Sequence, residues 1–136
     1  MPWVNRQRAV KAIESLYAKL FARICSPEAR TEGAAHLICY MFWDLFPLSP
    51  TALPRPDQER VEPTVPMDIL CLKVMERCLT IPHSACRRGA LHGLGHWQAC
   101  YPQRVTDIID RFLENTSDLP SDLQAYAESA RVGEVQ

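Results

Sequence analysis

Two histidines on one predicted helix are the residues of this sequence whose spacing is best suited to chemistry. His92 and His96 are four residues apart in the segment ALHGLGHW, so an α-helix places both side chains on one side, a turn apart. Two imidazoles at this spacing can bind one metal ion, and Cys100 follows one turn later. The set is incomplete, because Gly93 occupies the place of the glutamate in the zinc-protease pattern H-E-x-x-H and the helix has no acidic residue.

Three interpretations of the histidine pair stay open. The two side chains are packed histidines bonded to a neighbouring turn, part of a surface for a partner or ligand, or metal ligands. The sequence favours the first, since His36 holds the matching place in the first half of the chain. Asp44 is expected to cap a neighbouring helix or to accept a bond from a histidine, which are structural roles. We therefore assign no catalytic residue, no metal ligand and no cofactor.

The candidate binding residues are this pair, three neighbours on the same predicted helix, and the histidine at the matching place in the predicted helix 27–46. They are His92, His96, His36, Trp97, Arg87 and Arg88. Arg87 and Arg88 could bind an anion or a carboxylate through their forked donors, or form a solvated basic turn. Trp97 lies on the stripe expected to face the core, whereas Gly89 and Gly93 lie on or beside the histidine flank. Side chains this small let another helix or a ligand approach closely.

Helical periodicity recurs in six segments of the chain and indicates the fold class. Apolar residues recur at i, i+3, i+4 and i+7 in six segments, about 5–25, 27–46, 67–80, 84–101, from 102 onward, and 120–131. No segment alternates with a period of two. The prediction is an all-α fold of about six helices in antiparallel helix–turn–helix pairs, arranged as an αα-superhelix or an irregular bundle. The second helix is apolar nearly all round and is expected in the middle.

The chain is expected to form one domain over residues 1–136. A first helical pair covers 5–46, a proline-rich loop covers 47–66, and the remaining helices cover 67–131. Six prolines in the twenty residues of the loop exclude a helix there. The loop is either a recognition segment in polyproline II form or a tolerated insertion.

Two parts of the sequence match each other. Ala29, Gly33, Ala34 and His36 recur 56 positions later as Ala85, Gly89, Ala90 and His92. The apolar stripes of the preceding helices match as well, which indicates a duplicated helical pair. The run ACRRGALHGLGH at 85–96, with Pro102 and 105–113, resembles a HEAT-type helical repeat. That resemblance implies an αα-superhelical stack that tends to bind proteins, and it brings no catalytic residues.

Composition and charge narrow the function classes. The formal net charge is −1, from 15 basic and 16 acidic side chains, which disfavours nucleic-acid and membrane-surface binding. The start of the sequence lacks the apolar core of a secretory signal. The six cysteines form no C-x-x-C pair and are expected to be reduced core residues of a cytoplasmic protein.

Two hypotheses about function follow. The first is a small helical-repeat module that binds another protein, without enzymatic activity, for instance of the toxin-immunity or escort type. The second is an enzyme or sensor that binds a metal ion or small ligand through His92 and His96, with His36 nearby. The sequence does not decide the oligomeric state.

Overall fold

The computed structural model describes residues 1–26, 33–45 and 62–136, and it contains helices and no strand in these ranges. This confirms the predicted all-α class. The elements are α1 (Trp3–Leu16), η1 (Tyr17–Phe21), α2 (Ala22–Ile24), α3 (Ala34–Tyr40), α4 (Phe42–Leu45), α5 (Pro66–Leu79), α6 (Ser84–Trp97), α7 (Pro102–Asn115) and α8 (Ser121–Arg131). The start of the predicted second helix and most of the proline-rich loop lie outside the described residues, so neither interpretation of that loop is addressed.

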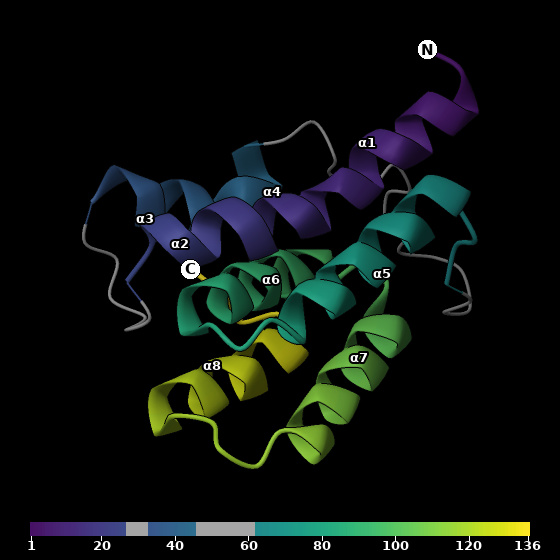
Figure 1. Cartoon of the computed structure of the whole chain (residues 1–136). Coiled ribbons are helices and arrows are strands. Elements are labelled where there is room, and N and C mark those ends of the chain that lie inside the picture. Colours follow the sequence, from purple (N-terminus) through teal and green to yellow (C-terminus); the bar gives the residue numbers. More distant parts are fainter. Residues whose placement is uncertain (27–32, 46–61) are drawn as a thin grey trace.

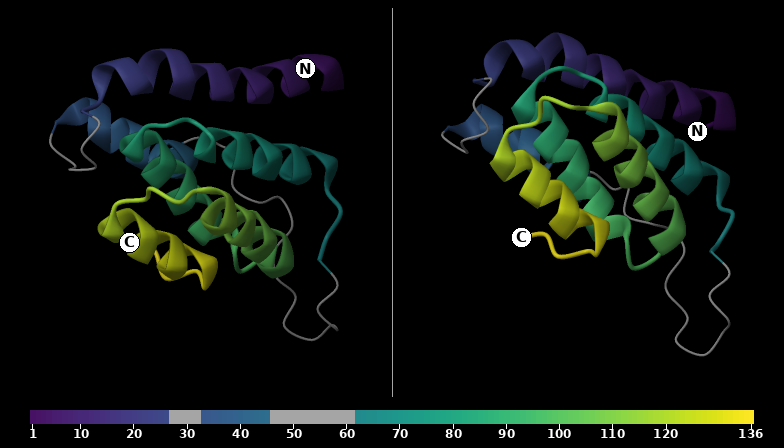
Figure 2. Two further views of the ribbon diagram at one scale, coloured as in Figure 1. Left: turned by 60° about the horizontal axis from the view of Figure 1, so that its bottom comes forward. Right: turned by 90° about the horizontal axis from the view of Figure 1, so that it is seen from below.

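Helix α6 lies at the centre of the molecule. It contacts α3, α4, α5, α7, α8 and η1, and both figures of the whole chain show it between the N-terminal helices and the α7–α8 pair (Figures 1 and 2). The expectation that segment 27–46 occupies the middle is wrong. Met41 divides its described part into two short helices, of which one side packs against α6 while Leu37 and Ile38 stay exposed.

Two glycines of α6 explain how the α3–α4 segment comes so close to it. A Cβ atom built at Gly93 would lie 2.7 Å from the ring of Trp43, and one built at Gly89 would lie 2.5 Å from the carbonyl oxygen of Cys39. Both distances are too short for any other residue without movement of the neighbour. The predicted close approach of another helix to this small-residue flank is therefore confirmed, and it places Asp44 beside α6.

The helices start and end at recognisable signals. His83 caps α6: its Nδ1 accepts the N–H of Cys86 at 3.4 Å, so its Nε2–H donates to the Cys25 carbonyl oxygen at 3.1 Å. Helix α7 begins at Pro102, and the side chain of Glu62 accepts its free N–H groups at Gln103 and Arg104. Glu62 thereby attaches the end of the proline-rich segment to α7.

All six cysteines are unpaired thiols and five are buried, as predicted for reduced core residues. The core cluster draws side chains from α1 and η1 through to α8. In the π-helical turn η1, Tyr17 and Phe21 are both buried and meet edge to face, with ring centroids 5.0 Å apart. No helix in the described ranges has the length and apolar character needed to span a membrane.

The two matching sequence stretches differ in backbone structure. Gly33 precedes α3 with a φ of 98°, in the left-handed region, whereas Gly89 lies inside α6. His36 accepts the backbone N–H of Ser26 at 2.9 Å, and His92 takes part in a different set of contacts described below. The sequence match therefore does not extend to a shared local conformation at these positions.

Candidate metal centre

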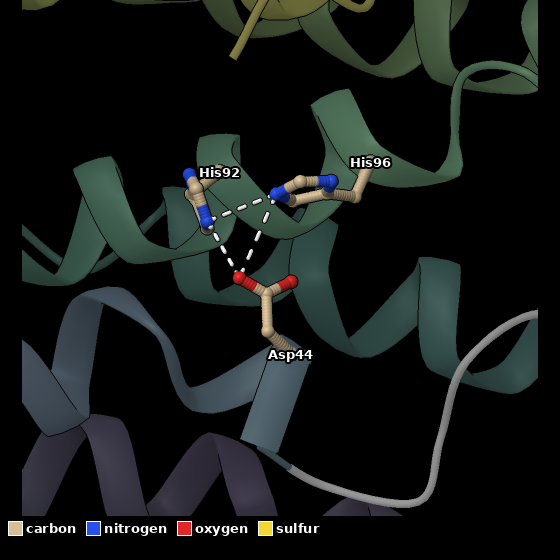
Figure 3. A group of neighbouring side chains, drawn as sticks. All are labelled: Asp44, His92 and His96. Carbon is tan, nitrogen blue, oxygen red and sulfur yellow. Dashed lines mark hydrogen bonds and ion pairs between the residues drawn. The ribbon is translucent and has the colours of Figure 1, made fainter. Parts of the chain in front are cut away.

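Three side chains from two separate segments converge beside the C-terminal half of α6. The Nε2 atoms of His92 and His96 are 3.1 Å apart, and Asp44 Oδ2 lies 2.7 Å from the former and 3.6 Å from the latter (Figure 3). His92 is fully buried, whereas the side chains of Asp44 and His96 are 24% and 45% exposed. The group thus forms a small triangle of ligand-type atoms that is closed on the protein side and open toward solvent.

These distances suit a bound metal ion. Zinc–nitrogen bonds of about 2.0–2.1 Å imply ligand–ligand separations of about 2.9 Å in an octahedral site and about 3.3 Å in a tetrahedral one. The three observed separations, 2.7, 3.1 and 3.6 Å, bracket both values. No other group of three His, Cys, Asp or Glu side chains within the described ranges converges in this way. An ion would require shifts of only about 0.6 Å or less.

Packing of α4 holds the carboxylate in place. Trp43, the residue before Asp44, is buried and lies on the face of α6 that Gly93 leaves open. Its ring also meets the ring of Phe42 edge to face, with centroids 5.6 Å apart. Because the indole fills this space, the next side chain points along α6 toward the histidines. The acidic ligand that the sequence of α6 lacks is therefore supplied by a segment 48 residues away.

A second group of contacts lies behind His92. Its Nδ1 is 2.9 Å from the hydroxyl oxygen of Tyr126 in α8, and that oxygen is 2.7 Å from the hydroxyl oxygen of Tyr40. Tyr40 in turn donates to the backbone carbonyl oxygen of Gln136, and its ring lies against the His92 ring at a centroid distance of 4.1 Å, tilted by 37°. The Arg88 guanidinium lies 4.5 Å above the ring of Tyr126. His92 is therefore held from both of its ring nitrogens.

The electrostatics favour a neutral ring at His92. Burial lowers the pKa of His92 below its ordinary value, while the bond to Asp44 opposes that shift. Burial also raises the pKa of the Tyr126 hydroxyl, and the bond to Tyr40 adds to the effect. A neutral imidazole is the form that binds metal ions, and a protonated phenol is the form that donates hydrogen bonds.

The other residues singled out from the sequence lie elsewhere. His36 bonds to Ser26, and Trp97 is buried in the core and stacked on Tyr101. Arg87 donates to the carbonyl oxygen of Leu79, and Cys100 does not belong to the metal-binding group. Of the six candidates, only His92 and His96 belong to the converging group, and Arg88 reaches its edge through Tyr126.

The structure adds Asp44, Tyr126 and Tyr40 to the site. The predicted bond from a histidine to Asp44 is confirmed, although the sequence assigned it a structural role only. Nothing in the sequence marks Tyr126, which lies on the apolar stripe of a weak helix, or connects it with Tyr40. Comparison of the chain with protein-family models, with curated proteins and with solved structures gives no match.

Proposed function

We propose that this protein binds one divalent transition-metal ion through Asp44, His92 and His96. The observation that carries the proposal is the convergence of two imidazole nitrogens and one carboxylate oxygen, from α6 and α4, within metal-binding distance of one another. This reverses the order of preference reached from the sequence, where the missing acidic ligand counted against a metal.

The ligand set indicates the class of ion and the chemistry it would support. Imidazole and carboxylate together suit Zn²⁺, Fe²⁺, Co²⁺ and Ni²⁺ better than Ca²⁺ or Mg²⁺. Three protein ligands leave at least one coordination position, and the exposure of His96 and Asp44 directs it toward solvent. A water molecule or a small anionic ligand would occupy that position, so the site supports either sensing of the metal or metal-assisted hydrolysis.

Metal content measured on protein purified without a histidine tag tests the proposal. After incubation with Zn²⁺ and removal of excess ion, we expect about one Zn²⁺ per chain, and none in a variant carrying both His92→Ala and His96→Ala. A Cys100→Ser variant is the control, since Cys100 is the only cysteine that is not fully buried, and it should retain the ion. Folded wild-type protein without bound metal would contradict the proposal.

A protein-binding role remains a second proposal, and a specific observation favours it. Leu20, Ile24, Leu37 and Ile38 are large apolar side chains exposed on η1, α2 and α3, and α3 contacts η1. Large apolar side chains exposed on neighbouring elements are candidates for contact with another protein. A HEAT-like αα-stack would present them on one side. The six free thiols support a cytoplasmic location. A metal-free protein that keeps its fold would leave this role as the preferred one.

A further inference from the structure

The contacts behind His92 form one continuous chain of hydrogen-bonding atoms. It runs from Asp44 through the two ring nitrogens of His92 to the hydroxyl groups of Tyr126 and Tyr40, and it ends at the backbone carbonyl oxygen of Gln136. We propose that Tyr126 and Tyr40 are positioning residues that hold His92 with its proton on Nδ1 and couple metal occupancy to docking of the tail at 132–136. This inference rests on the proposed metal site.

A metal ion at Nε2 would fix the direction of this chain of contacts. Four contacts link the five groups. An ion at Nε2 would replace the contact between His92 and Asp44 and leave the proton of the ring on Nδ1. The ring and the two phenols then bring three protons for the three remaining contacts.

With a metal bound, every donor in the chain points in one direction. His92 Nδ1–H donates to the Tyr126 oxygen, Tyr126 O–H donates to the Tyr40 oxygen, and Tyr40 O–H donates to the carbonyl oxygen of Gln136. The last bond can run only from Tyr40 to Gln136, because a carbonyl oxygen only accepts. A ligand histidine whose other nitrogen donates to a fixed acceptor is held in the tautomer and orientation that metal binding needs.

The tail has its own means of docking against α6. Gly133, with a φ of 81°, ends α8 and turns the chain back, and its N–H bonds to the carbonyl of Ala130. Val135 then lies against Gly95, where a Cβ atom would collide with its methyl groups. This places Gln136 beside Tyr40. The carbonyl oxygen of Gln136 accepts the bond from Tyr40 and thereby favours the His92 tautomer that binds metal. Because coupling between two sites is reciprocal, a bound metal ion must in turn hold the segment 132–136 more tightly against Tyr40.

Zn²⁺ titration of Tyr126→Phe and Tyr40→Phe in the full chain tests the inference. For Tyr126→Phe we expect the Kd for Zn²⁺ to rise by about 10- to 100-fold, because the Nδ1 proton loses its acceptor. Tyr40→Phe should raise the Kd less, since the bond between Tyr126 and His92 remains. Tyr17→Phe is the matched control: it removes another buried phenol, which donates to the Cys39 carbonyl at 2.9 Å, and should leave the Kd unchanged.

Two nuclear magnetic resonance signals separate positioning from general stabilisation. In Zn²⁺-bound wild type, His92 should show a slowly exchanging proton on Nδ1, and adding Zn²⁺ should shift the methyl signals of Val135. Tyr126→Phe should lose the first signal, and Tyr40→Phe should lose the second response.

If the wild type binds Zn²⁺ and Tyr126→Phe binds it with an equal Kd, the positioning role of the tyrosines is overturned while the metal site stands. Failure of the wild type to bind Zn²⁺ would instead overturn the proposed function. If Tyr126→Phe fails to fold, an unchanged Kd and Val135 response in Tyr40→Phe overturns the coupling.

Discussion

Replacing His96 by alanine is expected to lower the affinity for Zn²⁺ by at least about 100-fold, because loss of a partner behind a ligand already costs about 10- to 100-fold. The same change should alter the free energy of unfolding by less than about 1 kcal/mol, since the His96 side chain is 45% exposed. Isothermal titration with Zn²⁺ and urea unfolding of the metal-free protein measure the two effects. His96 thus separates metal binding from folding better than buried His92 does.

His36→Ala is the control for this change. It removes the histidine at the matching position of the first half, which bonds to Ser26 and lies outside the converging group. Its Zn²⁺ affinity should equal that of the wild type. Equal affinities for His96→Ala and wild type would mean that the ion is held elsewhere and that the three converging atoms are not its site.

Trp43→Ala is expected to lower the free energy of unfolding by about 3–5 kcal/mol, the usual cost of truncating a buried tryptophan. The side chain is 2% exposed and fills the space that Gly93 leaves between α4 and α6. Losing it also releases the adjacent Asp44, so the folded fraction should bind Zn²⁺ more weakly. Urea unfolding gives the stability change, and titration under folding conditions gives the affinity.

Trp3→Ala supplies a matched comparison, because it is the same substitution at a side chain that is 43% exposed. It should cost less than about 1 kcal/mol and leave Zn²⁺ binding unaltered. A Trp43→Ala protein with wild-type stability would show that α4 does not rest on this side chain. Unchanged Zn²⁺ affinity despite lost stability would show that Asp44 needs no support from it.

The sequence predicted the helices because their signals are local. Apolar spacing marked the segments that became α1, α5, α6, α7 and α8, and Pro102 marked the first turn of α7. Pro66, which was assigned to the loop from the sequence, is the first residue of α5. The small-residue flank of α6 could also be predicted, because glycine destabilises a helix interior and Gly89 and Gly93 therefore indicate a close approach by another element. Two of the three proposed ligands followed from spacing alone, because residues four apart on a helix must be neighbours.

The rest of the site depends on tertiary packing. Asp44 meets His92 across 48 residues and Tyr126 meets it across 34, and no periodic pattern encodes such contacts. The placement of segment 27–46 in the middle was wrong for a related reason. Its apolar residues predicted burial on all sides, whereas the described part bends at Met41 and leaves Leu37 and Ile38 exposed. Apolar composition predicts that a helix packs, but not how many neighbours it has.

X-ray absorption at the zinc edge, on the protein loaded with one equivalent of Zn²⁺, tests the metal site most directly. The proposed ligands predict a first shell of nitrogen and oxygen only, at about 2.0–2.1 Å, with outer-shell scattering from two imidazole rings. The chain also contains six free thiols that could compete for the ion. A sulfur shell at about 2.3 Å, or scattering without imidazole rings, would contradict the assignment to Asp44, His92 and His96.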